Sequence, residues 1–380
     1  MRCACRPLLA VALVAFLGCG GHSANTSDGG HDGGAGIEAG SPLLDGGAGR
    51  PDVGGPGADG GDGLPDAGGP EADGGGVHDA MRSMDGGNAD AETGVGPYGS
   101  NGPDTVTTSS FMVTAGDTFT TTAYIPSGAG PFPVVILSSG FEQPGAAYAP
   151  YASRLASWGI TTFLRDDPGV FSNLTAVDLA SDVSYMVTSW LAATNADASS
   201  ALSGKVTTSR IGLAGHSRGG QVALLAGEMG AIGKIQGVFG LDPVDTAVGS
   251  VEARTTIGSL GVPIAFIGET TDSTGGVGGM PCAPAADNFQ VLFQAASSPA
   301  VAISAVNADH TMFEAPSSCQ FCTLCTAGTA NQPDVLAMSV RYLTAFFARQ
   351  LLGDTTVGAT FAGAGATEDL TAGAIQLVSK

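Results

Sequence analysis

The sequence predicts an α/β fold in which a mostly parallel central sheet of about eight strands carries helices on both faces. Short apolar runs alternate with segments of helical periodicity along residues 105–380, and this alternation is typical of parallel strands joined by crossover helices. Residues 105–380 are also numerous enough to form one large hydrophobic core. We therefore expect a single domain over this range.

Strands are expected where apolar runs are short and bounded by turn residues. Alternation of apolar and polar residues over 106–115 and 118–126 predicts an antiparallel hairpin. The continuous apolar run FPVVIL at 132–137 is typical of a strand buried on both faces. Further strands are expected over 160–164, 210–214, 234–241, 262–267 and 300–306.

Helices are expected between these strands, where apolar residues recur every three to four positions. Their ranges are 147–158, 174–193, 219–229, 287–296 and 334–352. The helix over 174–193, for example, places Leu179, Val183 and Met186 on one face. We expect this face to pack against the rest of the domain.

Residues 20–104 differ sharply in composition from the predicted domain. They hold 28 of the 60 glycines and 15 Asp and Glu residues, against Arg50 and Arg82 as the only basic side chains. Such a stretch cannot bury enough apolar surface to offset the entropy of ordering it. We predict a disordered Gly/Asp-rich tether with a root-mean-square span of roughly 50 Å.

The first 19 residues have the features of an export signal. Arg2 and Arg6 are followed by an apolar run over 8–17 that is too short to span a bilayer. FLGC at 16–19 resembles a bacterial lipobox, in which the cysteine is lipidated. We predict a lipoprotein-type signal and a lipid anchor at Cys19 that holds the protein on a membrane of the bacterial cell envelope. The alternative is secretion without lipid.

Charge and composition exclude several classes of protein. The formal net charge is −21, and the chain has no cluster of Lys and Arg, so it lacks the electrostatic footprint of a nucleic-acid-binding protein. Its glycines occur in clusters and not at every third position, which excludes collagen. No segment after the signal is apolar over a length sufficient to span a membrane.

Four cysteines remain after the signal and Cys19 are set aside, and an even number in an exported domain predicts two disulfides. They are Cys282, Cys319, Cys322 and Cys325. The C-x-x-C-x-x-C spacing could instead suggest a metal site, which we regard as the weaker interpretation. Pairing within that cluster is geometrically tight, so Cys282 is expected to pair with one of the other three.

The sequence GHSRGG at 215–220 places Ser217 in a Gly-x-Ser-x-Gly pattern. In a glycine-rich chain the pattern alone says little, but here it joins a predicted strand to a predicted helix. A nucleophile elbow occupies that kind of turn, because glycines on both sides of the serine allow the backbone to turn sharply. We predict that Ser217 is a nucleophile. The alternative is a plain glycine-rich loop.

A serine hydroxyl needs a base to remove its proton, and elimination nearly identifies the base. Three of the five histidines lie in the predicted tether. His216 adjoins Ser217 on the turn and is expected to point away from its hydroxyl. His310 remains, and it follows the last predicted strand.

Ester hydrolysis also needs N–H donors where the oxyanion forms. The amide of Arg218, directly after the nucleophile, is the first candidate. The second is the amide of Phe141 in the loop SSGFEQPG at 138–145, where Gly140 permits a close approach. The alternative is a structural turn with an exposed Phe141.

Four motifs together resemble the chlorophyllase family of α/β-hydrolases, over roughly residues 130–310. They are GHSRGG at 215–220, LDPVD at 241–245, MPCAP at 280–284 and NADHTMF at 307–313. The resemblance implies an α/β-hydrolase fold and a triad of Ser217, Asp242 and His310. The chain departs from the family at 138–140, where Ser-Ser-Gly replaces the usual His-Gly pair.

Without the resemblance, the acid of the triad stays open. Asp242 ends the strand immediately after that of the nucleophile, whereas Glu269 and Asp272 follow the next strand, where most α/β-hydrolases carry the acid. Asp309 is excluded because it adjoins His310, and Asp245 could be a solvated charge. The resemblance favours Asp242.

These residues predict a serine carboxylesterase that forms an acyl-enzyme on Ser217. No metal or organic cofactor is implied, and the expected partner is a small-molecule or lipid ester. The alternatives are a lipase, a polyester hydrolase of cutinase type and, from another class, a non-catalytic surface lipoprotein on the same scaffold. A peptidase is disfavoured because nothing marks a site for a leaving amine.

Overall fold

The computed structural model describes several stretches of the chain, which all lie in one compact unit of residues 83–380. They are 96–169, 171–229, 233–246, 251–275, 281–315, 324–357 and 366–380. The predicted signal, including Cys19, lies outside the described residues, as does most of the predicted tether.

The structure describes the chain from residue 96, inside the range 20–104 predicted to be disordered. A 3₁₀ turn, η1 (Gly96–Gly99), carries Tyr98, whose side chain is buried. The Tyr98 hydroxyl donates to Asp354, and its ring packs edge-on against Trp158. The prediction that the last residues of this range belong to a disordered tether is therefore wrong, because one aromatic side chain packs the segment onto the domain.

One sheet contains nine strands of the described residues, in the order β1-β2-β4-β3-β5-β6-β7-β8-β9. The strands are β1 (Val106–Thr114), β2 (Thr118–Pro126), β3 (Phe132–Ser138), β4 (Thr161–Arg165), β5 (Val206–His216), β6 (Ile235–Leu241), β7 (Ile264–Gly268), β8 (Ala300–Ala305) and β9 (Ile375–Ser379). Neighbours from β4 to β8 pair in parallel, whereas β1, β2 and β9 form antiparallel edges. The predicted mostly parallel sheet is confirmed.

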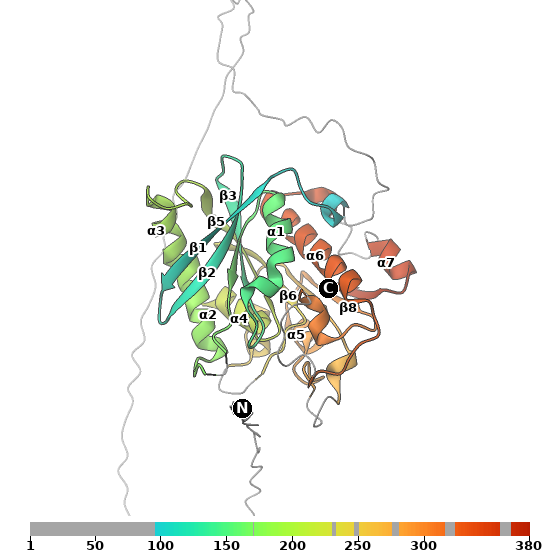
Figure 1. Ribbon diagram of the computed structural model, residues 1–380. Coiled ribbons are helices and arrows are strands. Elements are labelled where there is room, and N and C mark those ends of the chain that lie inside the picture. The colour runs from blue at the N-terminus through green and yellow to red at the C-terminus, as the bar shows by residue number, and fades with distance from the viewer. Residues whose placement is uncertain are drawn as a thin grey trace, which may run out of the picture. The chain divides into compact units, whose positions relative to one another are not determined.

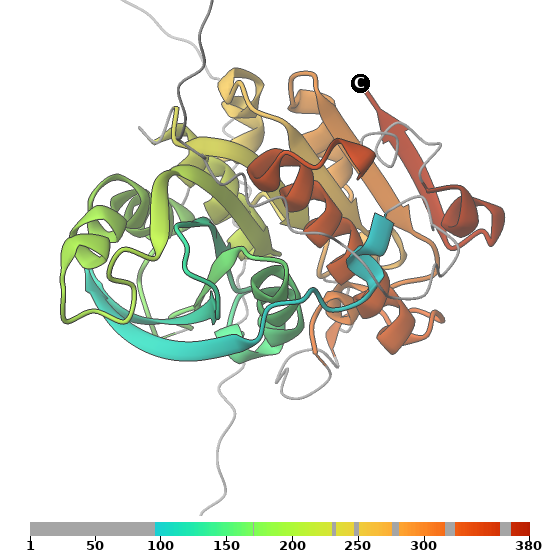
Figure 2. The same ribbon diagram turned by 90° about the horizontal axis from the view of Figure 1, so that it is seen from above.

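Helices cover both faces of this sheet, as predicted (Figures 1 and 2). Two of them bury their apolar residues in one core cluster: α1 (Ala149–Ser157) and α6 (Gln332–Phe347). Four contribute to the cluster on the other face: α2 (Ala176–Tyr185), α3 (Leu191–Ala196), α4 (Arg218–Glu228) and α5 (Phe289–Ala295). A short helix, α7 (Thr367–Thr371), precedes β9.

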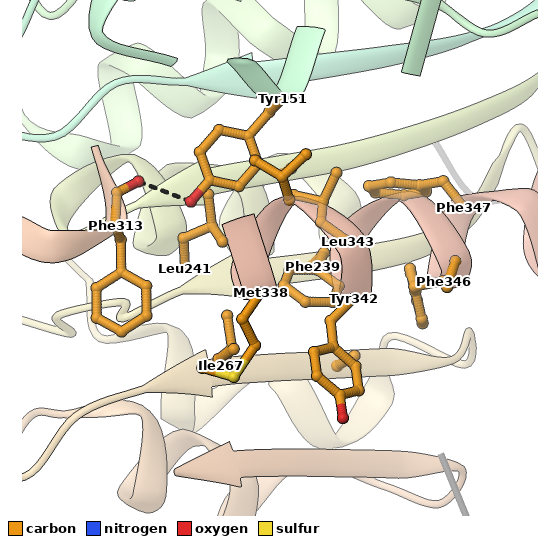
Figure 3. Packing of buried hydrophobic residues seen from close by; sticks show 14 of the residues in the cluster. Tyr151, Phe239, Leu241, Ile267, Phe313, Met338, Tyr342, Leu343, Phe346 and Phe347 are labelled. Carbon is orange, nitrogen blue, oxygen red and sulfur yellow. Dashed lines mark hydrogen bonds between the residues drawn. The ribbon is translucent and has the colours of Figure 1, made fainter. Parts of the chain in front are cut away.

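The core beneath α6 is built from large side chains that meet the sheet directly (Figure 3). The rings of Phe239 in β6 and Phe347 in α6 lie 6.5 Å apart, and burying a phenylalanine side chain stabilises the fold by about 1.5–3 kcal/mol. On the same side, the Tyr151 hydroxyl of α1 donates to the carbonyl of Phe313 at 2.7 Å. This bond ties the 3₁₀ turn η8 (His310–Phe313) to α1.

Two elements differ from expectation. The helix predicted over 174–193 is α2 and α3 joined by a π-helical turn, η3 (Met186–Trp190), without a break in helical dihedral angles. Strand β9 was not predicted, because only one of its five residues is fully buried and its existence depends on pairing with β8. None of the helices formed by the described residues is long and apolar enough to cross a bilayer.

Candidate active site

Ser217 occupies a sharp turn between β5 and α4. Its backbone has φ 54° and ψ −124°, a left-handed conformation that is costly for a residue with a side chain. The flanking glycines make the turn possible. A Cβ on Gly215 would lie 2.0 Å from the carbonyl oxygen of Gly219, and a Cβ on Gly219 would lie 2.2 Å from that of Ser138. The Gly-x-Ser-x-Gly spacing is thus required by the packing of this turn.

His310 opens η8, just beyond the end of β8, and is buried. Its Nε2 lies 2.9 Å from Oγ of Ser217. Neighbouring Asp309 holds the turn in place, since its carboxylate accepts from the amides of Thr311 at 2.9 Å and Gly328 at 2.7 Å. Asp309 therefore supports the loop and does not reach the far ring nitrogen of His310, as its position in the sequence indicates.

Asp242 follows β6 and contacts the other nitrogen of the same imidazole. Its Oδ2 lies 2.6 Å from Nδ1 of His310, and its Oδ1 accepts from the amide of Glu269 at 3.1 Å. The backbone of Asp242 is also strained, with φ 38°, while its amide donates to the carbonyl of Ile267 at 2.6 Å. The structure thus brings Ser217, His310 and Asp242 into one hydrogen-bonded chain.

Negatively charged carboxylates around His310 raise the pKa of its imidazole. Burial alone would lower the pKa of the imidazole, but the hydrogen bond and negative charge of Asp242, with the carboxyls of Glu269 and Glu314 nearby, outweigh it and raise the pKa. The proton on Nδ1 is assigned from the carboxylate acceptor. In the neutral ring Nε2 is then the acceptor, which is the form that can take a proton from Ser217.

Asp272, the second candidate for the acid, does not contact His310. Its two carboxylate oxygens accept from the amides of Cys282 and Thr326, each at 3.0 Å. It therefore joins two loops and serves neither ring nitrogen. Glu269 is closer: one of its carboxylate oxygens, one of Asp242 and a ring nitrogen of His310 all lie within 4.8 Å of one another.

The suggestion that Asp245 is a solvated charge is wrong, because its side chain is completely buried. Oδ1 accepts from the side-chain amide of Gln221 at 3.1 Å and from the amide of Ala253, while Oδ2 accepts from the amide of Arg254 at 3.0 Å. Burial raises the pKa of Asp245, although the hydrogen bonds from the amides of Arg254 and Ala253 oppose this effect. The residue anchors the loop after β6.

The loop at 138–145 lies against Ser217. A Cβ on Gly140 would be 3.4 Å from Cβ of Ser217 and 2.9 Å from Nδ1 of His216, so this position tolerates only glycine. The first amides of a helix lack intrahelical acceptors, and Arg218 begins α4. Within the described part of the chain, no acceptor is paired with the amide of Arg218 or Phe141. Both predicted donors thus have uncommitted N–H groups: Arg218 directly follows Ser217, and Phe141 directly follows Gly140, which lies against Ser217.

Arg218 also braces this loop through its side chain. Its guanidinium lies over the ring of Phe141, 4.6 Å from the centroid, and its Nε donates to Asp167 at 2.9 Å. Asp167 in turn accepts from the amide of Glu142 at 3.1 Å. Phe141 is 43% exposed, which leaves one apolar ring at the surface beside the serine.

A buried chain behind the serine was not foreseen from the sequence. His216 points away from the Ser217 hydroxyl, as expected, and its Nε2 lies 3.0 Å from the carbonyl oxygen of His310. Burial, followed by the nearby His310, lowers the pKa of His216 well below its usual range. The ring is therefore neutral with its proton on Nε2, and Nδ1 accepts from the Tyr148 hydroxyl at 2.8 Å. No sequence spacing marks Tyr148 as part of the site.

One disulfide joins Cys282 to Cys325, which confirms that Cys282 pairs within the predicted set. Cys319 and Cys322 lie outside the described residues, so the second predicted disulfide stays a prediction. The bond closes the same two loops that Asp272 connects through backbone amides. These loops flank the segment that carries His310.

Among the residues that the structure describes, two groups of side chains lie close enough together to share a metal ion: Asp272 with Cys282 and Cys325, and Asp242 with Glu269 and His310. In the first group the sulfurs are bonded to each other and cannot act as thiolates. In the second, Nδ1 of His310 already pairs with Asp242. Neither donor set suits a resident metal in this arrangement.

Comparison with known families agrees with the geometry. The model of the chlorophyllase family matches residues 101–358, which include every element that carries the site. The chain belongs to the chlorophyllase family. As a chlorophyllase-family protein it has the α/β-hydrolase fold, and membership indicates a hydrolase of the esterase type with a small-molecule ester as substrate. A comparison with curated proteins found no match.

Proposed function

We propose that this chlorophyllase-family protein is a serine carboxylesterase that acts through Ser217, His310 and Asp242. The observation that supports the proposal most strongly is the continuous chain from Oγ of Ser217 through both nitrogens of His310 to Oδ2 of Asp242, with distances of 2.9 and 2.6 Å. This order of nucleophile, base and orienting acid is the constellation that activates a serine.

In the first half-reaction, Oγ of Ser217 bonds to the ester carbonyl carbon while Nε2 of His310 takes the hydroxyl proton. The tetrahedral intermediate then breaks its bond to the leaving alkoxide, which receives that proton from Nε2 and departs as an alcohol. In the second, water attacks the acyl-serine while its proton passes to Nε2 of His310, and the tetrahedral intermediate then breaks its bond to Oγ of Ser217, which takes that proton back as the carboxylic acid leaves. Asp242 stays ionised and stabilises the imidazolium in both halves.

The oxyanion of each intermediate is proposed to bind between the amides of Arg218 and Phe141. The amide of Arg218 directly follows Ser217, that of Phe141 follows Gly140, which packs against Ser217, and the Arg218 side chain braces the Phe141 loop. An oxyanion donor is worth about 10²–10³ in kcat. Preorganisation of the loop by Asp167 spares the cost of ordering it during reaction.

The exposed ring of Phe141 favours an ester with an apolar acyl or alcohol portion. The loop after β4, which carries the fully exposed Phe171, is fastened to the same region because Asp167 accepts from the amides of Glu142 and Gly169. A lipase or polyester hydrolase with the same machinery would differ in the length of the ester that it accepts.

A lipid anchor at Cys19 remains part of the proposal and rests on the sequence FLGC at 16–19. It would hold the hydrolase at a membrane surface of the cell envelope. Fractionation of cells producing the full chain tests it: Cys19→Ser should move the protein from the membrane to the soluble fraction, and wild-type protein that is already soluble would refute it.

The function is tested with purified protein and a panel of p-nitrophenyl and isoprenoid-alcohol esters. We expect hydrolysis by the wild type and loss of it in Ser217→Ala with an unchanged melting temperature. Absence of activity on every ester, despite correct folding, would instead favour a non-catalytic surface protein.

A further inference from the structure

We propose that Glu269 is a second acid of the triad, placed so that it can orient His310 when Asp242 cannot. The inference rests on the proposed esterase function and concerns a positioning residue of the same site. It starts from the fact that both loop positions able to carry a triad acid, after β6 and after β7, hold a carboxyl here, and both carboxyls lie close to one imidazole.

The backbone around Glu269 is shaped to bring the two carboxyls together. Gly268 precedes it, and a Cβ at that position would lie 2.6 Å from Oδ1 of Asp242 and 2.3 Å from the ring of Phe289. The amide of Glu269 donates to the same Oδ1 at 3.1 Å. Asp242 and Glu269 are thus held side by side at the ends of neighbouring strands.

The Glu269 side chain is completely buried, and its two oxygens differ in their surroundings. Oε2 accepts from the amide of Asp272 at 2.8 Å, which fixes the carboxyl in one position. Oε1 is buried without a hydrogen-bond partner among the described residues. An unsatisfied buried polar atom costs about 1–3 kcal/mol and calls for an explanation. A role toward the adjacent triad supplies one, since Glu269, Asp242 and His310 have polar atoms within 4.8 Å of one another.

The electrostatics fit a reserve role. Glu269 lies near two carboxylates, Asp242 and Asp272, and near the imidazole of His310, which also feels the charge of Glu314. Burial, followed by the charge of Asp242, raises the pKa of Glu269 to about 8. While Asp242 is ionised, Glu269 is therefore mostly protonated near neutral pH. If the charge of Asp242 is removed, the carboxyl of Glu269 ionises more readily and becomes the anionic neighbour of His310.

The test compares Asp242→Asn with the double variant Asp242→Asn/Glu269→Gln in the full chain. Hydrolysis of a p-nitrophenyl ester is measured from about pH 6 to about pH 10, after subtraction of the rate with Ser217→Ala, which removes hydroxide-driven turnover. Asp242→Asn should keep a residual kcat that rises with pH as Glu269 ionises. In the double variant this residual should be at least about tenfold lower at the alkaline end, with KM little changed.

Asp242→Asn/Asp272→Asn is the matched control, because Asp272 lies in the same loop but its carboxylate faces backbone amides. At the alkaline end of the pH range, where Glu269 is ionised in both variants, its residual activity per folded molecule, with folding checked by thermal unfolding, should equal that of Asp242→Asn. The proposal is overturned if the Gln substitution leaves the pH profile of Asp242→Asn unchanged and lowers only its melting temperature, as a structural role predicts. Failure of the esterase proposal looks different, because wild-type protein would then be inactive or Ser217→Ala would be active.

Discussion

The hydroxyl of Tyr148 lies 2.8 Å from Nδ1 of His216 and also accepts the amide of Gly140 at 3.1 Å. One side chain thereby connects the loop beside the proposed oxyanion site to the residue that precedes the nucleophile. Since Nε2 of His216 donates to the carbonyl of His310, the connection continues to the backbone of the proposed base. Two segments that must keep a fixed distance during catalysis are joined through buried, neutral groups.

Tyr148→Phe should therefore lower kcat more than it raises KM, because it frees the loop without removing a group that contacts substrate. The substitution leaves a buried amide and a buried ring nitrogen without partners, so we expect a loss of about 2–4 kcal/mol in the free energy of unfolding. Steady-state kinetics and urea denaturation measure both effects. Tyr185→Phe, at a partly exposed position, is the control and should change neither.

Asp242→Asn should reduce kcat by about 10⁴ if Asp242 orients His310, since an amide favours the wrong imidazole tautomer. Asp272→Asn should lose little activity. Removing the charge of Asp242 also lowers the pKa of His310, and the base must be neutral to act. In Asp242→Asn/Glu269→Gln, where neither of these carboxylates is left beside the ring, the rising limb of kcat/KM against pH should therefore move to lower pH. The opposite ranking of the two variants would place the acid in the loop after β7.

The disulfide should contribute stability through the length of the loop it closes. Cys282 and Cys325 are 43 residues apart, and a loop of that size corresponds to about 4 kcal/mol in the chain-entropy description. The double variant Cys282→Ala/Cys325→Ala should unfold at correspondingly lower denaturant concentration. The wild type in reductant provides a second comparison. A midpoint unchanged from that of the oxidised wild type would show that the loops are held by Asp272 alone.

Stability should fall as the pH rises from about 4.5 to about 7, because of Glu314. Burial raises the pKa of this carboxyl from its ordinary 4.5 to about 7. Between these values the folded protein holds a proton that the unfolded chain has released, so each rise in pH favours unfolding. Glu314→Gln removes this titrating group. The melting temperature of the variant, relative to that of the wild type, should therefore rise as the pH increases from about 4.5 to about 7. Parallel curves would contradict the burial argument.

The fold was largely predictable because its signals are local. Apolar runs such as FPVVIL mark strands buried on both faces, and Gly215 in the turn at Ser217 is required by a contact with Gly219, which follows it closely in the sequence. Strand β9 escaped prediction since its burial comes from pairing with β8, not from its own pattern. Likewise, Tyr98 packs a glycine-rich segment that composition alone assigns to the tether.

The candidate site was predictable where elimination or motif order limited the choices, as for Ser217 and His310. It was not predictable where the role of a residue depends on the direction in which its side chain points in the folded protein. Asp245 and Asp272 have the same side chain as Asp242, and only the folded loops show that the first two bind backbone amides. Tyr148 and the closeness of Glu269 to His310 depend on contacts between distant segments, which a single sequence does not encode at any fixed spacing.

The central claim is that Ser217 is a nucleophile activated by His310, and covalent labelling tests it most directly. Protein is incubated with a fluorophosphonate ester, digested and analysed by mass spectrometry. The account predicts one phosphonyl group on the peptide containing Ser217, slow or absent labelling in His310→Ala, and none on that peptide in Ser217→Ala. An adduct on another serine, or equal labelling of Ser217 with and without His310, would contradict it.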